Sequence, residues 1–588
     1  MSFNLKNDYD TTQIALPPQP LPSIEATSYK LLEWAKPLLD NDEYQASLDA
    51  VMTFCETKGS GEQLQQALVQ AEDRYWSGKA WQDHYLRHRD SLAIHSNVFY
   101  YLESQLHLHE FSPVQIAAAL AISATEFMLE IQRGTLSQDF QGKAPLCMDQ
   151  YQQLFGATRI PGELRDRILI HPKADHMMVM VKQQFFPVRL FDAEGNIRHY
   201  MDLSAELDAI KNSAIDEAVN IGIMTGANRA WWAKKREYIK QHSAQNQACF
   251  EQIEHAAFVL CLDEDAPQLD NDIAQKLLHG KGDNRYFDKV LQFIVFNNGK
   301  SGINYEHTGI DGSVMLRLIR HLYDTVPLAI DDTQKAMPLA STPSPLTWTI
   351  DSTIEQAISH AEEEFARHCN GYQTQVIHFN AFGQDAIKQR NISPDAFVQL
   401  ALQLAEFRSQ GSNHSAYEAI MTRTFDQGRI DVLYTVTPEA QHFIRAFAEH
   451  RPQAEIANAL RDAATAHIGR AKECQKGSGI ATHLLALEYS YEHLNAYHSE
   501  KERPELFQCP AYQKLMHTII CTSTTSYYGV LLAGYGPVVD GGYGLRYFKR
   551  ANELTFIATC QTKTYPQMER YLRTLEQTLH DMYRLLAE

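Results

Sequence analysis

The sequence lacks the features that several common classes of protein require. Its nine cysteines are scattered, with no C-x-x-C pair and no Cys/His spacing typical of a zinc site. This pattern predicts a reducing compartment, no disulfide framework and no metal site. There is no block of Lys and Arg, and the net charge is −19, which argues against nucleic acid or an anionic membrane surface as a partner.

Long apolar runs and targeting signals are also missing from the sequence. No apolar stretch is predicted to approach the roughly 18 residues that span a bilayer, so we expect no membrane anchor. The first residues, MSFNLKNDYDTT, have neither a secretory apolar core nor the Arg-rich character of an organelle presequence, and the chain ends in LLAE. The expected location is therefore the cytoplasm.

What is present predicts a globular protein with more than one domain. With 588 residues, 44% of them hydrophobic and 21% charged, the chain is too long for one ordinary core. Residues 328–347 are rich in Pro, Ser and Thr and show no periodicity, so they form the best candidate for an interdomain linker.

Periodicity predicts helices and strands on both sides of that linker. Residues 22–110 are predicted to be helical, and strands alternate with helices from about 145 to 325. Ser393-Pro394-Asp395 is typical of a helix start, because Ser caps the helix and Pro fits its first turn. A terminal helix is expected at 568–586. The predicted strands are 177–181, 185–191, 290–296, 529–534, 543–548 and 554–560.

One histidine stands in a context suited to proton transfer. His307 follows a predicted strand and the hairpin signal Asn298-Gly299, and it opens the pattern H-x-x-x-D-G that ends in Asp311-Gly312. An imidazole titrates near neutrality, so it can take a proton from a hydroxyl or thiol and later return one. Among 25 histidines, however, most are expected to be surface or core residues, and the pattern alone does not decide the role of His307.

Short segments spread along the chain agree with a single family. They are 16–22 (LPPQPLP), 145–151 (PLCMDQY), 284–289 (NRYFDK), 305–307 (YEH), 392–397 (ISPDAF), 417–418 (YE), 428–429 (GR) and 535–539 (YGPVV). In this order, and together with the H-x-x-x-D-G pattern, they resemble the carnitine/choline O-acyltransferases of the CoA-dependent acyltransferase superfamily. The resemblance covers nearly the whole chain.

The resemblance implies an α/β fold with two chloramphenicol acetyltransferase-like domains around a central active-site tunnel. Each domain would be a mixed sheet with flanking helices. We expect one domain with the catalytic histidine at 90–345 and a second with the CoA-binding and oxyanion residues at 346–588. The helical segment 1–89 is expected to pack with the second domain. Acyl-CoA and a small alcohol would be the substrates, without a tightly bound cofactor, and the chain is expected to be a monomer.

The same resemblance implies the catalytic residues. His307 corresponds to the general base of the family, and Asp311 and Arg429 correspond to an ion pair that braces the histidine loop. A plain structural ion pair is the alternative for Arg429.

The oxyanion donor depends on the register of a serine and threonine run. Counting back from Gly536 places the Ser-Thr-Ser triplet of the family at Cys521-Thr522-Ser523, which makes Ser523 the donor of the hydrogen bond to the oxyanion. A shifted register would make Ser526 the donor. The alternative is that these hydroxyls only line a β-strand.

For CoA, the family has two lysines before the Ser-Pro-Asp helix. Lys388 matches the second, but the first is Gln384 here, and Arg390 is the candidate replacement. We therefore expect weaker CoA binding than at a two-lysine site, and an exposed lysine by itself is weak evidence. The other predicted CoA contacts are Asp395, Glu418 and Thr524.

The acceptor side departs from the carnitine enzymes. Ile430 replaces a threonine, Thr482 replaces an arginine and Cys521 replaces the first serine of the triplet. A buried carboxylate would therefore lack charge-assisted partners, which is costly. Tyr535 is where the family has an aromatic residue facing the trimethylammonium group, and Tyr417 is retained. Choline or a related amino alcohol is the leading acceptor, with a neutral alcohol or polyol as the alternative.

One position bears on acyl length. Ala533 stands where short-chain members have a bulky residue, so we predict a deeper acyl pocket, unless neighbours such as Leu531 fill the space. The predicted function is CoA-dependent O-acyl transfer to a small alcohol. The alternatives are a carnitine acyltransferase with an altered carboxylate site, an acyl-CoA hydrolase, a catalytically silent CoA-ester binding protein, and a thiolate mechanism through Cys521.

Overall fold

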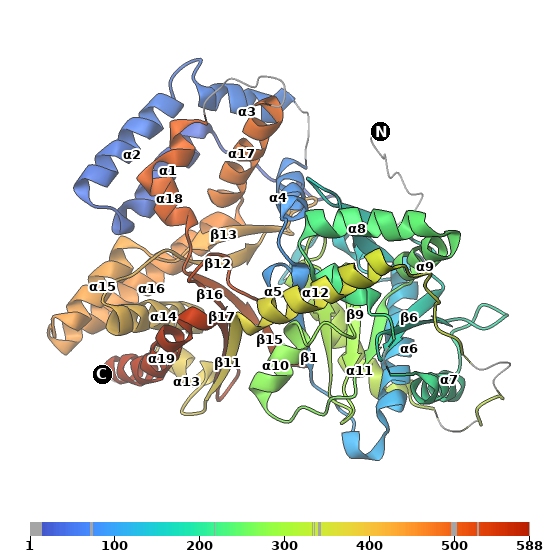
Figure 1. Ribbon diagram of the computed structural model, residues 1–588. Helices are drawn as coiled ribbons and strands as arrows, with labels where there is room; N and C mark the ends of the chain where they lie inside the picture. The colour runs from blue at the N-terminus through green and yellow to red at the C-terminus, as the bar shows by residue number, and fades with distance from the viewer. Residues whose placement is uncertain are drawn as a thin grey trace.

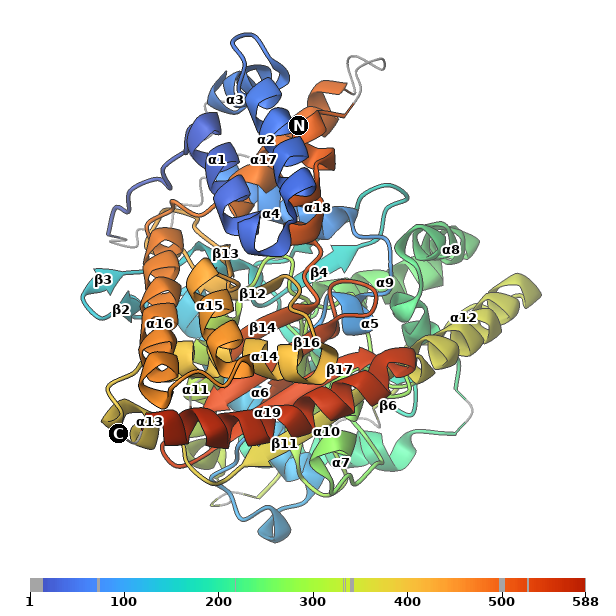
Figure 2. The same cartoon turned by 90° about the vertical axis from the view of Figure 1, so that its left-hand side faces the viewer.

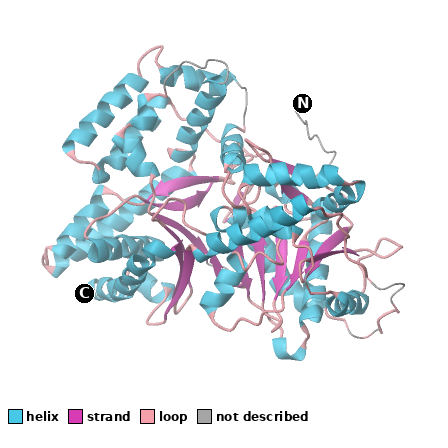
Figure 3. Cartoon of the chain, in the orientation of Figure 1, coloured by secondary structure: helices cyan, strands magenta, loops and turns pink. Residues whose placement is uncertain are grey.

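The chain folds around two large β-sheets, each covered by helices (Figure 1 and Figure 3). This computed structural model describes residues 14–70, 75–216, 218–331, 333, 335–338, 343–495, 503–525 and 528–586. These residues form a seven-stranded sheet, a six-stranded sheet and two small two-stranded sheets. The predicted α/β class with two mixed sheets is confirmed, because both large sheets combine parallel and antiparallel pairs.

The first sheet has the strand order β15-β1-β10-β9-β8-β6-β7. Its strands are β1 (Val98–Leu102), β6 (His176–Val181), β7 (Gln184–Arg189), β8 (Val259–Leu262), β9 (Leu291–Val295), β10 (Ser301–Tyr305) and β15 (Val530–Gly534). The helices around it are α5 (Leu92–His95), α6 (Pro113–Gln132), α7 (Tyr200–Ser213), α8 (Arg229–His242), α9 (Ala244–His255), α10 (Asp270–Leu278), α11 (Gly312–Ala329) and α12 (Ser352–Asn370).

The second sheet has the strand order β11-β17-β16-β14-β12-β13. Its strands are β11 (Tyr372–Phe379), β12 (Ala416–Met421), β13 (Ile430–Tyr434), β14 (Ile520–Thr525), β16 (Tyr543–Lys549) and β17 (Leu554–Gln561). The helices packed around it are α13 (Gln384–Gln389), α14 (Pro394–Gln410), α15 (Pro438–Ala448), α16 (Gln453–Gln475) and α19 (Tyr565–Leu585). The small sheets pair β2 (Phe140–Gln141) with β3 (Ala144–Pro145) and β4 (Ala157–Ile160) with β5 (Arg167–Ile170).

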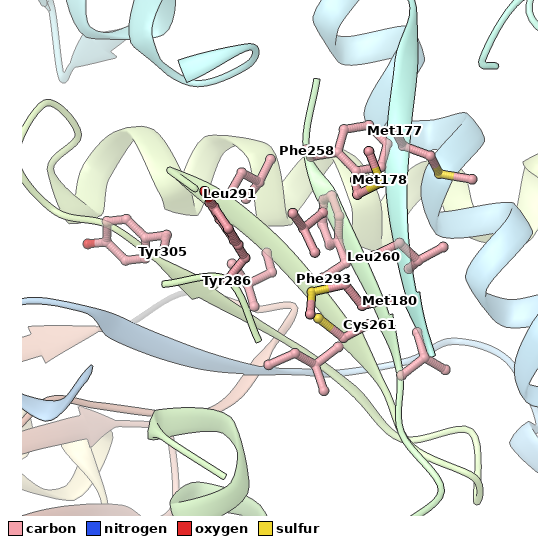
Figure 4. Close-up of a cluster of buried hydrophobic side chains, with 14 of the residues drawn as sticks. Met177, Met178, Met180, Phe258, Leu260, Cys261, Tyr286, Leu291, Phe293 and Tyr305 are labelled. Carbon is pink, nitrogen blue, oxygen red and sulfur yellow. The ribbon is translucent and has the colours of Figure 1, made fainter. Parts of the chain in front are cut away.

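The core of the first half is centred on the middle strands of its sheet. Met178, Leu260 and Phe293, from β6, β8 and β9, are completely buried and are drawn together in Figure 4. Both faces of these strands are covered, so their sequences are continuous apolar runs rather than alternating ones. The predicted strands at 177–181 and 290–296 are found as β6 and β9.

The prediction of helix over the whole of residues 22–110 is wrong at Val98–Leu102. This VFYYL segment is strand β1, and all five of its residues are buried. Aromatic and β-branched side chains suit a pleated strand better than a helix, and pairing with β10 and β15 fixes the choice. The strand carries Tyr100 to the centre of the molecule.

Strand β15 crosses from the second half of the chain into the first sheet. It pairs antiparallel with β1, with Ala533 opposite Tyr100 and Gly534 opposite Phe99. A Cβ atom on Gly534 would lie 2.7 Å from the Phe99 ring, so this position needs glycine. The two halves are therefore joined by main-chain hydrogen bonds as well as by side-chain packing.

In the second sheet, neighbouring strands β12 and β14 separate part of the way along. Their parallel pairing runs from Ala416 opposite Ile520 to Glu418 opposite Thr522. Beyond that point, residues 419–421 of β12 pair only with β13, and residues 523–525 of β14 pair only with β16. Main-chain pairing within the sheet is interrupted at this place.

The N-terminal helices pack on elements from near the end of the chain. Helices α1 (Ile24–Ala35), α2 (Asn41–Phe54), α3 (Ser60–Gln70) and α4 (Trp76–Arg87) form one cluster with β13, α17 (Ala481–Asn495) and α18 (Pro510–Met516). Figure 1 and Figure 2 both show the blue helices beside the orange and red ones. Trp34 and Tyr434 meet within this cluster, with ring centroids 6.3 Å apart.

The expectation that no apolar stretch approaches the length of a membrane span is wrong for α6. This helix has 20 residues, a mean hydropathy of 1.5 over its most apolar window, and 72% of that window buried. Alanines fill much of it, and it packs against α7 and α11 beside the first sheet. Its apolar composition therefore fits the interior of this fold.

Other local predictions are confirmed. The Asn298-Gly299 signal forms the turn between β9 and β10, with Gly299 at φ 79°. The Ser393 hydroxyl accepts a hydrogen bond from the backbone N–H of Ala396, 3.4 Å away, at the start of α14.

Candidate active site

A cavity of about 530 Å³ is lined by residues of both sheets and of the N-terminal helices. Tyr305 and His307 come from the first half of the chain, and Tyr417 and Ser523 come from the second sheet. Trp81 of α4 also lines it, so the cavity lies where three parts of the fold meet. Most of the wall is aromatic or aliphatic, with a few polar groups, as is usual for small-molecule sites.

His307 is held in one tautomer by the backbone. Its Nδ1 lies 2.6 Å from the carbonyl oxygen of Ile310. A carbonyl only accepts, so Nδ1 carries the proton and Nε2 keeps its lone pair. Burial lowers the pKa of His307 below its ordinary value of 6.5. The imidazole is therefore neutral at pH 7, and Nε2 has no hydrogen-bond partner among the described residues.

The aromatic rings of Tyr85 and Tyr305 flank this imidazole. Their centroids lie 5.4 and 5.6 Å from that of His307. The two rings fix the plane of the histidine without competing for its nitrogen atoms.

Asp311 and Arg429 meet as an ion pair beneath the histidine loop. Arg429 donates to both carboxylate oxygens of Asp311, each at 2.9 Å, and to the carbonyl oxygen of Thr308 at 2.8 Å. The side chain of Gln150 closes the arrangement, because its amide donates to Asp311 at 2.8 Å and accepts from the Asp311 backbone N–H at 2.7 Å. The carboxylate is 4.0 Å from Nδ1 of His307, so it supports the loop rather than bonding to the ring.

The charges of Asp311 and Arg429 compensate each other. Burial opposes ionisation of Asp311, but the Arg429 guanidinium holds the pKa of that carboxyl below its ordinary value. The loop that carries His307 is thus braced by a buried, charge-neutral unit.

Cys521 and Ser523 lie on the same face of β14 and line the cavity. The Cys521 thiol donates to the Tyr417 hydroxyl at 2.7 Å, and burial raises the pKa of Cys521 to about 11. Cys521 is therefore a thiol at neutral pH, which disfavours a thiolate mechanism. The Ser523 hydroxyl has no hydrogen-bond partner among the described residues, and Ser526 lies outside them.

The predicted acceptor residues are only partly brought together. Ile430, Tyr417 and Tyr535 line the cavity with Cys521. Thr482 does not, because its hydroxyl is turned to Asp431, 3.1 Å away, and accepts from the Trp81 indole at 3.2 Å.

Sequence reasoning missed the aromatic residues and the carboxylate at the α17 end of the cavity. Tyr434 and Tyr512 line the wall there, and the Tyr512 hydroxyl donates to Glu488 at 3.0 Å. Trp81 and Tyr85 complete the aromatic wall from α4. Their spacing of four residues on a helix was the signal that could have found them, since it puts both on one face.

Two of the predicted CoA residues meet on the other face of the second sheet. Asp395 contacts Lys549, and the Tyr547 hydroxyl reaches Asp395 at 2.9 Å and Glu418 at 3.1 Å. Nε2 of His467 lies 3.6 Å from each carboxylate. Although burial opposes it, these acids raise the pKa of His467 to about 9. The cluster thus contains two carboxyl groups, of Asp395 and Glu418, and two cations, Lys549 and His467.

The remaining predicted residues stand apart from that cluster and from the cavity. Lys388 is 57% exposed at the end of α13, 3.8 Å from Asp385. The Thr524 hydroxyl donates to the carbonyl oxygen of Tyr547 at 3.3 Å. Ala533 is fully buried in β15 and is not among the residues that line the cavity.

Two groups of described residues have ligand-type atoms close enough to share a metal ion: Asp395, Glu418 and His467, and Cys147, Asp149 and Asp426. In the first, Lys549 and the protonated His467 already compensate the carboxylates. In the second, Asp149 and Asp426 lie beside the buried Cys147 thiol, whose pKa burial raises to about 11. All nine cysteines are free thiols.

Arg546 also lines the cavity and was missed. It belongs to the run Tyr543-Gly544-Leu545-Arg546-Tyr547-Phe548, where six neighbouring residues are buried. A charged side chain within a buried strand is rare, and this was the available signal.

Comparison with known proteins gives a consistent result. Residues 19–577 match the family described as choline/carnitine O-acyltransferase. Carnitine O-acetyltransferase of Columba livia is 30% identical over 98% of this chain and 94% of its own. Carnitine O-palmitoyltransferase 2 of Rattus norvegicus is 28% identical over 98% of this chain and 92% of its own. Among solved structures, the trichothecene 15-O-acetyltransferase TRI3 of Fusarium sporotrichioides matches with a TM-score of 0.39 and 10% identity, covering 86% of this chain and 94% of that one.

Proposed function

The chain belongs to the choline/carnitine O-acyltransferase family and is an acyltransferase, and from this premise we propose that it moves an acyl group reversibly between CoA and the hydroxyl of a small amino alcohol such as choline. In this proposal His307 is the general base. The observation that carries it is the hydrogen bond from Nδ1 to the Ile310 carbonyl, because it leaves Nε2 free to accept a proton inside the cavity.

The proposed reaction needs one base and one hydrogen-bond donor. Nε2 of His307 takes the proton of the acceptor hydroxyl as that oxygen attacks the thioester carbonyl. The carbonyl oxygen becomes negative, and the hydroxyl of Ser523 donates to it. The carbon–sulfur bond then breaks, and the imidazolium returns its proton to the CoA sulfur, so the base is regenerated. The reverse reaction uses the CoA thiol as the attacking group.

We infer that CoA reaches His307 through the place where β12 and β14 separate. Asp395 and Glu418 lie on one side of that place, and Ser523 lies on the other. Lys388 is one candidate for the CoA phosphates, and Arg461, which donates to the carbonyl oxygen of Arg390 at 3.1 Å, is another near the start of α14. A helix start adds a favourable dipole for anions.

The acceptor proposal rests on the aromatic walls. Tyr85, Tyr417, Tyr434 and Tyr535 line the cavity. Aromatic faces attract a quaternary ammonium group. Carnitine is the second candidate because the relatives named above are carnitine acyltransferases.

The test is CoA release from acetyl-, octanoyl- and palmitoyl-CoA with choline, L-carnitine, a polyol panel or no acceptor. We expect choline-dependent release that falls about 10³-fold or more in His307→Ala, since general base catalysis supplies about 10² to 10⁴ in rate. His442→Ala, an exposed histidine on α15, is the matched control and should match the wild type. Release with carnitine alone would contradict the acceptor proposal, and acceptor-independent release would indicate a hydrolase.

A further inference from the structure

Arg546 presents a buried guanidinium to the cavity with its charge unmatched. The side chain projects from β16, and the residue is only 4% exposed. Its Nε and Nη2 both donate to the Thr525 hydroxyl, at 2.9 and 2.6 Å, and Nη2 also donates to the Tyr100 hydroxyl at 3.1 Å. Its Nη1 has no hydrogen-bond partner among the described residues.

No carboxylate of the described residues lies within ion-pair distance of Arg546. Asp311 is already neutralised by Arg429, and Glu488 is paired with Arg503. The surrounding phenols do not supply a charge either, because burial raises the pKa values of Tyr305 and Tyr535 well above 10. The guanidinium also lies over the Tyr100 ring, 5.0 Å from its centroid. A buried cation without a counter-charge is nevertheless costly, and an anionic ligand would remove that cost.

The position of Arg546 indicates which part of the substrates would carry the anion. In the parallel pair of β14 and β16, Arg546 lies opposite Ser523, the proposed oxyanion donor. A Cβ atom on Gly312, the first residue of α11, would lie 3.6 Å from Nη2. Tyr100, which Arg546 contacts, is paired with Ala533 in the first sheet.

Two of the proposed acceptor residues lie on the opposite side of β14. Tyr417 of β12 and Ile430 of β13 are on that side, whereas Arg546 lies on the side of β16. Tyr535 lies between, because its hydroxyl donates to the carbonyl oxygens of both Cys521 and Leu545. The guanidinium is therefore placed beside the proposed oxyanion donor and away from Tyr417 and Ile430.

We propose that Arg546 selects acyl groups that end in a carboxylate, so that the preferred acyl donor is the CoA monothioester of a short dicarboxylic acid. This inference rests on the proposed acyl transfer. The far carboxylate takes no part in the chemistry: the ester carbon–oxygen bond forms, the carbon–sulfur bond breaks, and the hydroxyl proton passes through His307 to the CoA sulfur. The product is the half-ester of the dicarboxylic acid.

The kinetic test compares succinyl-CoA with butyryl-CoA, which have the same chain length and differ in the terminal carboxylate. We expect the wild type to have the higher kcat/KM for succinyl-CoA. In Arg546→Gln the ratio of the two kcat/KM values should fall about 100-fold, because truncating one partner of a buried charge pair has an effect of this order. Arg546→Lys keeps the charge but loses the planar fork, so its ratio should be intermediate. Arg573→Gln on α19, which is an exposed arginine paired with Glu569, is the matched control and should keep the ratio.

A binding measurement keeps the inference separate from the proposed function. Calorimetric titration of His307→Ala with succinyl-CoA and butyryl-CoA requires no turnover, and we expect tighter binding of succinyl-CoA that is lost in the His307→Ala, Arg546→Gln double variant. This result would support the inference even if the wild type transferred no acyl group. Thermal melting of each variant checks that it is folded. If Arg546→Gln is not folded, Arg546→Lys replaces it in both measurements.

Three outcomes would overturn the inference. One is a wild type that prefers butyryl-CoA in both measurements. The second is an equal loss of kcat/KM for both donors in Arg546→Gln, which would mean that the guanidinium stabilises the transition state or the fold. The third is an Arg546→Gln variant that changes the KM of L-carnitine but not the preference between succinyl-CoA and butyryl-CoA. The carboxylate that Arg546 binds would then belong to the acceptor.

Discussion

The two arginines beside the cavity, Arg429 and Arg546, are both buried but have opposite surroundings. Arg429 donates hydrogen bonds to both oxygens of the Asp311 carboxylate. It also donates to the backbone carbonyl oxygen of Thr308 in the His307 loop. Arg546 contacts the hydroxyls of Thr525 and Tyr100 and the face of the Tyr100 ring, and no carboxylate of the described residues pairs with it. The comparison teaches that a guanidinium with its own carboxylate is part of the scaffold, whereas one without a carboxylate is available to a ligand.

The strongest test of this difference is the stability of two matched variants. In Arg429→Met the buried Asp311 loses its partner, so we expect a loss of about 3 to 5 kcal/mol in the free energy of unfolding. Arg546→Met removes a buried cation that has hydroxyl and ring contacts but no carboxylate partner among the described residues, so its free energy of unfolding should be close to that of the wild type or above it. Thermal and urea denaturation of both variants measures this. A larger loss in Arg546→Met than in Arg429→Met would reverse the comparison.

A second test concerns the proposed role of Ser523, on the face of β14 that lines the cavity, as the oxyanion donor. Ser523→Ala should lower kcat about 10²- to 10³-fold, which is the usual effect of removing one oxyanion donor. Cys521→Ala, two residues away on the same face, is the matched control and should retain activity within about threefold, because its thiol is protonated and interacts with the hydroxyls of Tyr417 and Tyr535. The measurement is steady-state transfer to choline. Inactivity of Cys521→Ala with an active Ser523→Ala would favour a mechanism through the thiol.

The smallest expected effect is a shift in pH dependence. The neutral form of His307 is the proposed base, and burial lowers its pKa below 6.5, so kcat/KM should be level at neutral pH and fall tenfold per unit below that lowered pKa. Asp311 favours the protonated form of His307 and Arg429 opposes it. Asp311→Asn should therefore move the midpoint to lower pH. Arg546→Gln should leave the midpoint in place, and an upward shift in Asp311→Asn would contradict this account.

The sequence predicted the fold class and a set of candidate site residues, because these predictions depend on local pattern and on ordered motifs. Apolar runs predicted β6 and β9, and the motif order pointed to His307, Asp311 and Arg429, which the structure brings together. Helix was wrongly predicted at Val98–Leu102, since the preference of that segment is decided by the strands it pairs with.

Other assignments depended on the direction of a side chain, which motif matching does not give. Thr482 was predicted at the acceptor, but its hydroxyl is turned to Asp431. Lys388 and Asp395 were both predicted to contact CoA, and in the structure the cation that contacts Asp395 is Lys549, which is far away along the chain. Both depend on long-range packing rather than on neighbouring residues.

The sequence by itself determined the family of this chain and, through it, the fold class and the acyltransferase activity, because the ordered motifs that resemble the family are formed by neighbouring residues. Only the tertiary structure decided which charges are compensated. Arg429 and Asp311 are 118 residues apart, and Arg546 and Tyr100 are 446 apart. Whether a buried cation lies beside a carboxylate depends on how distant segments of the chain pack together, since an ion pair depends on distance in space and not along the chain.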